Sequence, residues 1–230
     1  MRISWGWGLI LMLIGCQNQP TSTLGYQKIS GTTMGTYYAI TWSGGPATAW
    51  KDSIDGLLLA FNEEVSTYID SSTIGRFNGS ETGILVDTSE NRDFWENFKL
   101  SLELVAITKG AFDPTVMPLV NYWGFGYTEK KAVSQVDSQQ VTSLLRLIGM
   151  DNLNLEYVDS LKLHLLKKNH PDVQLDFSAI AKGFGVDRIA EWLEKKGVNN
   201  YLVDIGGEMR SLGSNPKGGD WVIGINEPLE

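Results

Sequence analysis

Cysteine is nearly absent from this sequence: among 230 residues there is one, Cys16. A single thiol excludes a disulfide within the chain, so an oxidising compartment is permitted but not required. Histidine is scarce as well, because His164 and His170 are the two that occur. Neither stands at a spacing from a carboxylate or from the cysteine that is typical of a zinc site or a catalytic triad. We interpret both histidines as structural.

Basic residues are fewer than acidic residues and form no cluster in the sequence. The chain has 19 lysines and arginines against 27 aspartates and glutamates, which gives a formal net charge of −8 at pH 7. A protein that binds nucleic acid needs a basic face for the phosphate backbone, so this balance argues against such a partner. Hydrophobic residues make up 42% of the chain, which is enough for a substantial core and predicts a globular protein.

The apolar run at the N-terminus is too short to span a bilayer. Residues 5–15 are all apolar or glycine and follow Arg2, a pattern typical of a signal-peptide core. The run ends in Leu13, Ile14, Gly15 and Cys16, which resembles a bacterial lipobox, where cleavage after the glycine leaves a diacylated cysteine. A plain secretory signal that happens to contain a cysteine is the alternative. We predict a lipoprotein signal peptide over residues 1–15, a polar tether over 16–25 and one folded domain over 26–230.

Hydrophobic periodicity predicts an α+β architecture, with helices packed on mixed or antiparallel sheets. Alternation favours strands near residues 37–42 and 161–166, the second within a hairpin, and further strands at 173–177, 201–205, 208–212 and 221–225. Spacings of three and four favour helices over 54–65, 87–109, 134–148 and 178–196. The last three helices are each followed by a glycine, which is a common helix stop.

Two segments have the composition of a binding site. Residues 110–126 combine aromatic residues, proline and glycine more densely than the interior of a helix or strand would. Residues 175–187 run from an apolar stretch directly into a helix, which leaves backbone N–H groups at a helix N-terminus where an anion can bind. Together the two segments predict a phosphorylated aromatic ligand.

The polar and aromatic residues of interest each have an ordinary structural interpretation as well. Asp113 precedes a proline and can simply form a turn. Asp176 can cap the following helix, and Lys182 can be a solvated residue of its first turn. Met34 and Tyr68 can belong to the core, although Tyr68 also offers an aromatic face and a hydroxyl to a ligand.

Several short motifs, taken in order, give the strongest signal. They occupy residues 33–36, 66–68, 77–78, 110–126, 175–187 and 201–208 and are collinear across most of the chain. This set resembles the ApbE family, the FAD:protein FMN transferases of bacterial envelopes. The resemblance implies an ApbE-like, T-fold-like variant of the α+β architecture and a flavin nucleotide as ligand.

The resemblance also assigns residues to the ligands. It places Asp176 at the nucleotide part of FAD and Lys182 at another FAD-contacting position, where some family members have glutamate. It places Ala179 at a Mg²⁺ ligand position, where some members have threonine and this chain can offer a backbone carbonyl alone. No catalytic residue is implied. The remaining family positions, all near the flavin, match Met34, Tyr68, Ala111, Phe112 and Asp113.

The implied activity is Mg²⁺-dependent transfer of FMN from FAD to a threonine or serine of an acceptor flavoprotein, with release of AMP. The implied location is the bacterial envelope, on the periplasmic side of the inner or outer membrane, held by lipid on Cys16. Two alternatives stay open: an FAD pyrophosphatase, which a tyrosine at position 68 disfavours within the family, and a non-catalytic flavin-binding lipoprotein. Because the other family metal ligands follow a segment that this sequence does not contain, we expect a truncated reading frame.

Overall fold

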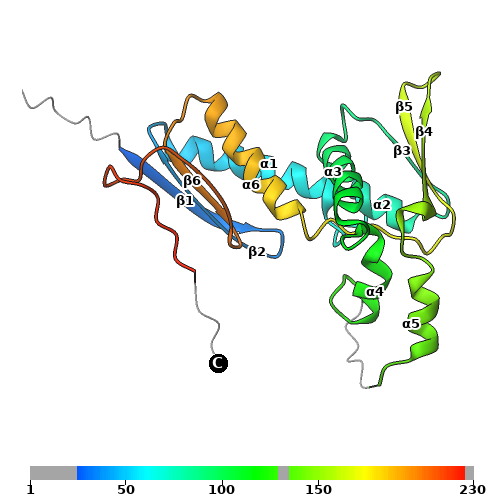
Figure 1. Cartoon of the computed structure of the whole chain (residues 1–230). Helices are drawn as coiled ribbons and strands as arrows, with labels where there is room; N and C mark the ends of the chain where they lie inside the picture. The colour runs from blue at the N-terminus through cyan, green and yellow to red at the C-terminus, as the bar shows by residue number, and fades with distance from the viewer. Residues whose placement is uncertain (1–24, 129–134, 226–230) are drawn as a thin grey trace, which may run out of the picture.

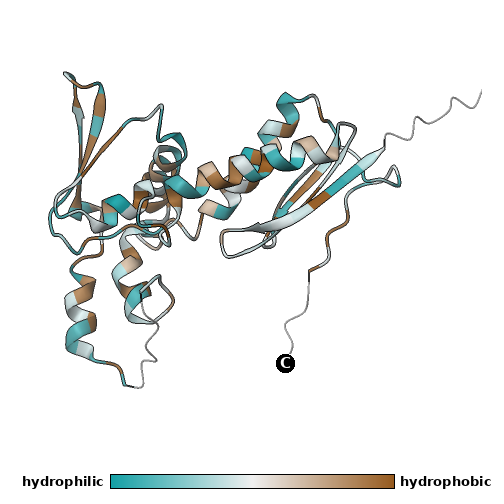
Figure 2. Ribbon diagram, turned by 180° about the vertical axis from the view of Figure 1, so that it is seen from behind, coloured by the Kyte–Doolittle hydropathy of each residue, from teal (hydrophilic) through white to brown (hydrophobic). Residues whose placement is uncertain are grey.

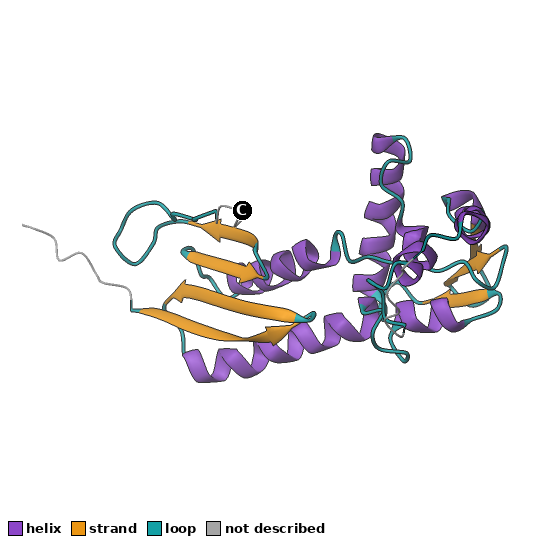
Figure 3. Ribbon diagram, turned by 90° about the horizontal axis from the view of Figure 1, so that it is seen from below, coloured by secondary structure: helices purple, strands orange, loops and turns teal. Residues whose placement is uncertain are grey.

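The computed structural model describes residues 25–128 and 135–225. They form two groups of elements, one around a four-stranded sheet and the other around a smaller sheet and most of the helices (Figure 1). Viewed from below, the four-stranded sheet lies against two long helices, and the remaining helices gather at the other end (Figure 3). The predicted signal peptide and most of the predicted tether lie outside the described residues.

The larger sheet is antiparallel throughout, in the order β1-β2-β6-β7. Its strands are β1 (Tyr26–Thr33), β2 (Thr36–Ser43), β6 (Tyr201–Ile205) and β7 (Glu208–Leu212). Pairing of Tyr38 with Ile205 sets the register between β2 and β6, so the β1–β2 turn and the β6–β7 turn lie at the same end of the sheet. Helices α1 (Ala47–Val65) and α6 (Ala181–Lys195) pack on this sheet and close the first core cluster.

The second group is mainly helical. A three-stranded antiparallel sheet, in the order β3-β5-β4, supports it at one edge. Phe61, Phe94 and Phe177 are fully buried at the centre of the second core cluster. The elements are α2 (Thr73–Gly79), β3 (Gly83–Val86), α3 (Arg92–Thr108), η1 (Pro114–Val116), α4 (Met117–Tyr122), α5 (Ser138–Leu145), η2 (Met150–Asn152), β4 (Leu153–Val158) and β5 (Leu163–Lys168).

Helix α1 joins the two groups because its apolar stripe continues past the sheet. Ile54 and Leu58 belong to the first core cluster, whereas Phe61 and Val65, one and two turns further on, belong to the second. The hydropathy colouring of Figure 2 shows the brown faces of the helices turned toward their neighbours and teal patches on the outer faces. One continuous helix therefore fixes the relative position of the two cores.

Much of the predicted secondary structure is confirmed. The structure has the strands predicted near residues 37–42, 201–205 and 208–212, the hairpin that includes residues 163–166, and the helix ending at Val65. The long central helix also ends as predicted, because Lys109 adopts a left-handed conformation and Gly110 follows with φ +84°. Within the described residues, no helix combines the length and the apolar content that a membrane crossing requires.

Five predicted boundaries or elements are wrong. Helix α3 begins at Arg92 and not at Asp87, because the Asp87 carboxylate accepts from the N–H groups of Ser89 and Glu90 and closes a separate turn. Helix α5 begins at Ser138, capped by Asp137, and the predicted start at residue 134 lies outside the described residues. Residues 173–177 and 221–225 form no strand. Helix α6 begins three residues later than predicted, at Ala181.

Candidate functional site

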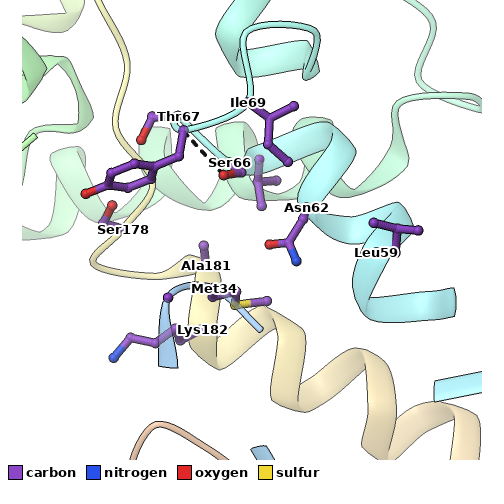
Figure 4. Close-up of a pocket in the computed structure, with 12 residues that line it drawn as sticks. Met34, Leu59, Asn62, Ser66, Thr67, Ile69, Ser178, Ala181 and Lys182 are labelled. Carbon is purple, nitrogen blue, oxygen red and sulfur yellow. Dashed lines mark hydrogen bonds between the residues drawn. The ribbon is translucent and has the colours of Figure 1, made fainter. Parts of the chain in front are cut away.

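A cavity of about 540 Å³ opens where the β1–β2 turn, the end of α1 and the start of α6 meet. Figure 4 shows Met34, Ala181 and Lys182 on one side of it and Ser66, Thr67 and Ile69 on the other. Three of the residues named from the sequence line this cavity, namely Met34, Tyr68 and Lys182. The other lining residues are Gly35, Leu59, Asn62, Val65, Ser66, Thr67, Ile69, Ser178 and Ala181.

Met34 reaches the cavity from a tight turn. It has φ +50° and is followed by Gly35 at φ +70°, so two left-handed residues connect the paired ends of β1 and β2. The side chain is half-buried and packs against both core clusters. Met34 packs against helix α6 at Gly185. A Cβ at that position would stand 2.6 Å from the Met34 Cε, so the glycine leaves room for the methionine. Met34 thus belongs partly to the core and also forms the floor of the cavity.

The loop after α1 holds Tyr68 away from the core. The carbonyl of Ser66 accepts from the Ser72 hydroxyl at 2.7 Å, and the Ser66 hydroxyl accepts from the Tyr68 N–H at 3.3 Å, the dashed line of Figure 4. Tyr68 is 68% exposed, and its hydroxyl reaches the carbonyl of Phe125 at 3.5 Å. The interpretation of Tyr68 as a core residue is therefore wrong. Its ring lines the cavity and is open to a planar ligand.

Lys182 brings a positive charge to the start of α6. The cap residue of this helix, Ile180, contributes no side-chain cap, although the N–H of Ala181 already donates to the Phe177 carbonyl at 2.8 Å. The N–H groups of Lys182 and Gly183 and the helix dipole are the part of the first turn that an anion can use. The ammonium of Lys182 lies 2.7 Å from a carboxylate oxygen of Glu208, the first residue of β7. Lys182 is therefore not simply solvated, since it carries a specific partner at the cavity edge.

Asp176 does not cap α6, because it lies five residues before the first helical residue. Its carboxylate accepts instead from the Ser178 N–H at 2.7 Å and closes the turn that leads into the helix. Its own N–H donates to the carbonyl of Pro114 at 2.7 Å. This hydrogen bond joins the two segments that the sequence singles out, residues 110–126 and 175–187.

Asp113 has the turn-forming role that the sequence allowed. Its carboxylate accepts from the N–H of Thr115 at 2.8 Å and from the Thr115 hydroxyl at 2.5 Å, and so caps η1. Phe112 and Asp113 are half-buried and Ala111 is exposed. None of these three residues is among those that line the cavity, although Pro114 ties them to the Asp176 segment.

The described residues do not form a magnesium site on their own. Ala179 is exposed in the turn before α6, and no described backbone N–H donates to its carbonyl. No group of three or more histidine, cysteine, aspartate or glutamate side chains is gathered anywhere in residues 25–128 and 135–225. One neutral carbonyl does not match the octahedral oxygen set that Mg²⁺ requires, so we derive no chemical step through a metal.

Two residues that position the site were not assigned a role from the sequence. The side-chain oxygen of Asn78 accepts from the N–H of Leu175 at 2.7 Å, and its side-chain NH₂ donates to the Leu175 carbonyl at 2.9 Å. These two bonds take the place of the strand pairing predicted there. The buried Lys168 donates to the carbonyls of Asn78, Pro171 and Val173, and burial lowers the pKa of its amine to about 8. A sequence signal existed for Asn78, which belongs to the motif at residues 77–78.

The histidines have surroundings that agree with a structural role. His164 packs between the rings of Trp95 and Tyr157, with centroid distances of 4.4 and 5.0 Å. His170 is exposed, and its Nδ1 accepts from the N–H of Asp172 at 3.1 Å. Neither histidine is among the residues that line the cavity.

The family model and the curated relatives that resemble this chain point to the same family. The family model described as ApbE family matches residues 34–230. The chain is 36% identical to the FAD:protein FMN transferase of Haemophilus influenzae over 225 residues, which covers 96% of this chain and 63% of that protein. It is 31% identical to the protein of the same name in Escherichia coli K12, with 96% and 63% coverage. The chain thus spans less than two thirds of the length of these curated relatives.

Solved structures agree with these likenesses. The flavin transferase ApbE of Vibrio cholerae superposes with a TM-score of 0.79 at 35% identity, over 89% of this chain and 64% of that one. The apo flavinyl transferase ApbE of Pseudomonas stutzeri gives 0.75 at 29% identity, over 87% and 65%. The predicted α+β fold with helices on antiparallel sheets is confirmed by these neighbours.

Proposed function

We propose, because the chain belongs to the ApbE family, that it is part of an FAD:protein FMN transferase and binds FAD in the cavity beside Met34, Tyr68 and Lys182. The observation that carries the proposal is one cavity with an exposed aromatic ring and a lysine at an uncapped helix N-terminus. A flavin nucleotide has an aromatic ring system joined to a diphosphate, which is the complementary combination. The names of the curated relatives support the same ligand.

The reaction is a substitution at phosphorus. A hydroxyl oxygen of a threonine or serine on an acceptor protein attacks the FMN phosphorus, and a new P–O bond forms. The bond from that phosphorus to the bridging oxygen of FAD breaks, AMP leaves with the electron pair, and the hydroxyl proton passes to solvent. Most of the catalytic work in such a transfer is orientation and stabilisation of negative charge.

The residues of this chain supply orientation and charge. We assign Tyr68 and Met34 to the flavin ring and Lys182 with the first turn of α6 to the diphosphate. Asp176 is not among the residues that line the cavity, and we assign it to the nucleotide part because its carboxylate lies in the turn that leads into α6. We assign Ala111, Phe112 and Asp113, which lie outside the cavity lining, to a supporting segment that the Pro114 carbonyl joins to Asp176. Lys182 acts as a point charge beside phosphate oxygens, as lysine does in other phosphate sites.

Magnesium dependence and lipid anchoring belong to this proposal as well. Of the described residues, Ala179 alone would offer a donor to Mg²⁺, through its backbone carbonyl, and the metal would supply charge neutralisation when bound. Anchoring through an acylated Cys16 would place the enzyme at a bacterial membrane, facing the periplasm, where it meets its acceptor flavoprotein.

The test is to incubate the purified gene product with FAD, Mg²⁺ and an acceptor protein that carries a flavinylation threonine. We expect in-gel flavin fluorescence on the acceptor, an FMN mass increment by mass spectrometry, and loss of both when EDTA is added. A matched acceptor with alanine in place of the threonine is the control for non-covalent flavin.

Two outcomes would contradict the proposal in different ways. Release of FMN and AMP without labelling of the acceptor would indicate the pyrophosphatase. Tight FAD binding with neither product would indicate the flavin carrier.

The Asp176→Asn variant separates ligand binding from folding, because asparagine keeps the acceptor for Ser178 and loses the charge. We expect it to weaken FAD binding by about ten- to a hundredfold with unchanged far-UV circular dichroism.

A further inference from the structure

We propose that Glu208 is the counter-ion which Lys182 exchanges for the diphosphate, so that this glutamate sets the affinity of the cavity for phosphorylated ligands. The inference rests on the proposed function, in which Lys182 binds the diphosphate of FAD. It concerns a residue to which the sequence motifs give no role.

Glu208 is the direct partner of the cavity lysine. The ammonium of Lys182 lies 2.7 Å from one carboxylate oxygen of Glu208 and 2.9 Å from the other, so both oxygens share the same charge. The pair connects the first turn of α6 with the start of β7. Lys182 lines the cavity, whereas Glu208 is not among its lining residues, so the glutamate holds the lysine from outside.

The backbone around Glu208 fixes its position. Gly206 has φ +58° and donates its N–H to the Tyr37 carbonyl at 3.0 Å. Gly207, at φ +97°, donates to the Asp204 carboxylate at 2.9 Å. The first bond holds the β6–β7 turn against the start of β2, beside the turn that carries Met34, and the second closes the β6–β7 turn on itself. The carboxylate of Glu208 is therefore delivered to the cavity edge by a fixed turn.

The ion pair is weak enough to be exchanged. The side chains of Lys182 and Glu208 are 33% and 43% exposed, so water screens the attraction and the pair contributes little to folding. A diphosphate carries more negative charge than one carboxylate and also meets the N–H groups of the α6 first turn. Lys182 would leave Glu208 for the phosphates, and the free energy spent in breaking this ion pair would lower the apparent affinity for the diphosphate.

The structure offers a matched control pair on the same two elements. Arg210 on β7 lies 2.9 Å from Asp187 on α6, with exposures of 37% and 53%. Neither residue is among those that line the cavity. Asp187→Asn removes one negative charge from the same α6–β7 interface, but it leaves Lys182 and Glu208 unchanged.

The experiment compares FAD and riboflavin binding in wild type, Glu208→Gln, Asp187→Asn, Lys182→Met and the double variant Lys182→Met/Glu208→Gln. We expect Glu208→Gln to tighten FAD binding by about two- to fivefold at low salt, the range that exposed ion pairs span. The gain should shrink at high salt, be absent for riboflavin, which has no phosphate, and be absent in Asp187→Asn. It should also vanish in the Lys182→Met background, because Glu208 acts through the lysine.

Several results would overturn the inference. They are unchanged or weaker FAD binding in Glu208→Gln, an equal gain in Asp187→Asn, or a gain that persists without Lys182. Failure of wild type to bind FAD would contradict the proposed function instead. In that case inorganic diphosphate replaces FAD as the ligand, and its binding is measured by the shift that it causes in melting temperature. The same set of variants then shows whether Glu208 competes with diphosphate for Lys182. Circular dichroism and melting of each variant without ligand show whether the fold is retained.

Discussion

Glu64 is a half-buried carboxylate that lies among three helices. It is on α1, accepts from the Phe94 N–H of α3 at 2.9 Å, and stands near the ion pair of Asp93 and Arg188, whose charged atoms are 2.9 Å apart. Burial raises the pKa of Glu64, and the charge of Asp93 raises it further, against the lowering effects of the Phe94 N–H and Arg188. Its ionised form therefore costs folding free energy at neutral pH.

We predict that Glu64→Gln raises the melting temperature at pH 7. A carboxyl whose folded pKa is above its unfolded value binds more protons in the folded state, so its stabilising contribution is present at low pH and lost as pH rises through the folded pKa. Glutamine keeps an acceptor for Phe94 and carries no charge at any pH. The advantage should close as pH falls below the ordinary glutamate value of 4.5.

Thermal melts at pH 7 and at pH 4 measure this difference. Glu63→Gln is the control, because Glu63 is exposed on the same helix and should show a smaller and less pH-dependent change. A lower melting temperature for Glu64→Gln at pH 7 would mean that attraction to Arg188 outweighs the cost of burial.

At the site, the sequence motifs named some residues that the structure brings together and others that it does not, because Ala111, Phe112, Asp113, Asp176 and Ala179 are not among the residues that line the cavity. Met34, Tyr68 and Lys182 do share one cavity, since each lies in a local motif. Lys182 and Glu208 are 26 residues apart and meet because helix α6 packs against β7, which the spacing of apolar residues does not reveal. A helix cap was an alternative role for Asp176 only because the sequence predicts the start of α6 three residues too early.

Among the elements, residues 171–177 show how a buried extended segment can exist without a sheet. Val173, Leu175 and Phe177 are fully buried, which is why their alternation favoured a strand. Their backbone groups are satisfied by side chains instead, with Asn78 pairing both polar groups of Leu175 and Lys168 binding two carbonyls nearby. Periodicity predicts which face is buried, but not which group completes the hydrogen bonds.

We predict that Asn78→Asp loosens this segment and, through it, the site. The carboxylate still accepts from the Leu175 N–H but repels the Leu175 carbonyl, which loses its donor in a buried place. The expected cost is about 1–3 kcal/mol of stability, measured by denaturant unfolding.

Hydrogen exchange separates this local effect from general destabilisation. Faster exchange should appear at residues 173–177 together with weaker FAD binding, because Asp176 lies within the segment. Asn169→Ala is the control, since the exposed Asn169 side chain bonds a single carbonyl, that of Asp151. Protection of residues 173–177 equal to wild type would contradict the role we give to Asn78.

At the scale of the molecule, α1 explains why the site lies where it does. The helix passes from one core to the other, and its C-terminal end, the β1–β2 turn and the start of α6 converge where the two cores meet (Figure 1). The apolar stripe of α1 could be predicted from its spacing. Its division between two cores could not, because periodicity identifies a buried face without naming what covers it.

The last prediction concerns the location of the protein in the cell, which depends on residues outside the described part of the chain. Because Cys16 is the one cysteine and follows Leu13, Ile14 and Gly15, we expect a bacterium to process the protein at Gly15 and to acylate Cys16. Two acyl chains give stable membrane attachment, so wild type should appear in the membrane fraction with a lipid-modified N-terminal peptide by mass spectrometry. Cys16→Ser should leave that fraction or persist as an unprocessed precursor, yet bind FAD as wild type does, because the cavity residues begin at Met34. A soluble, unacylated wild-type protein would show that the N-terminal run is an ordinary secretory signal.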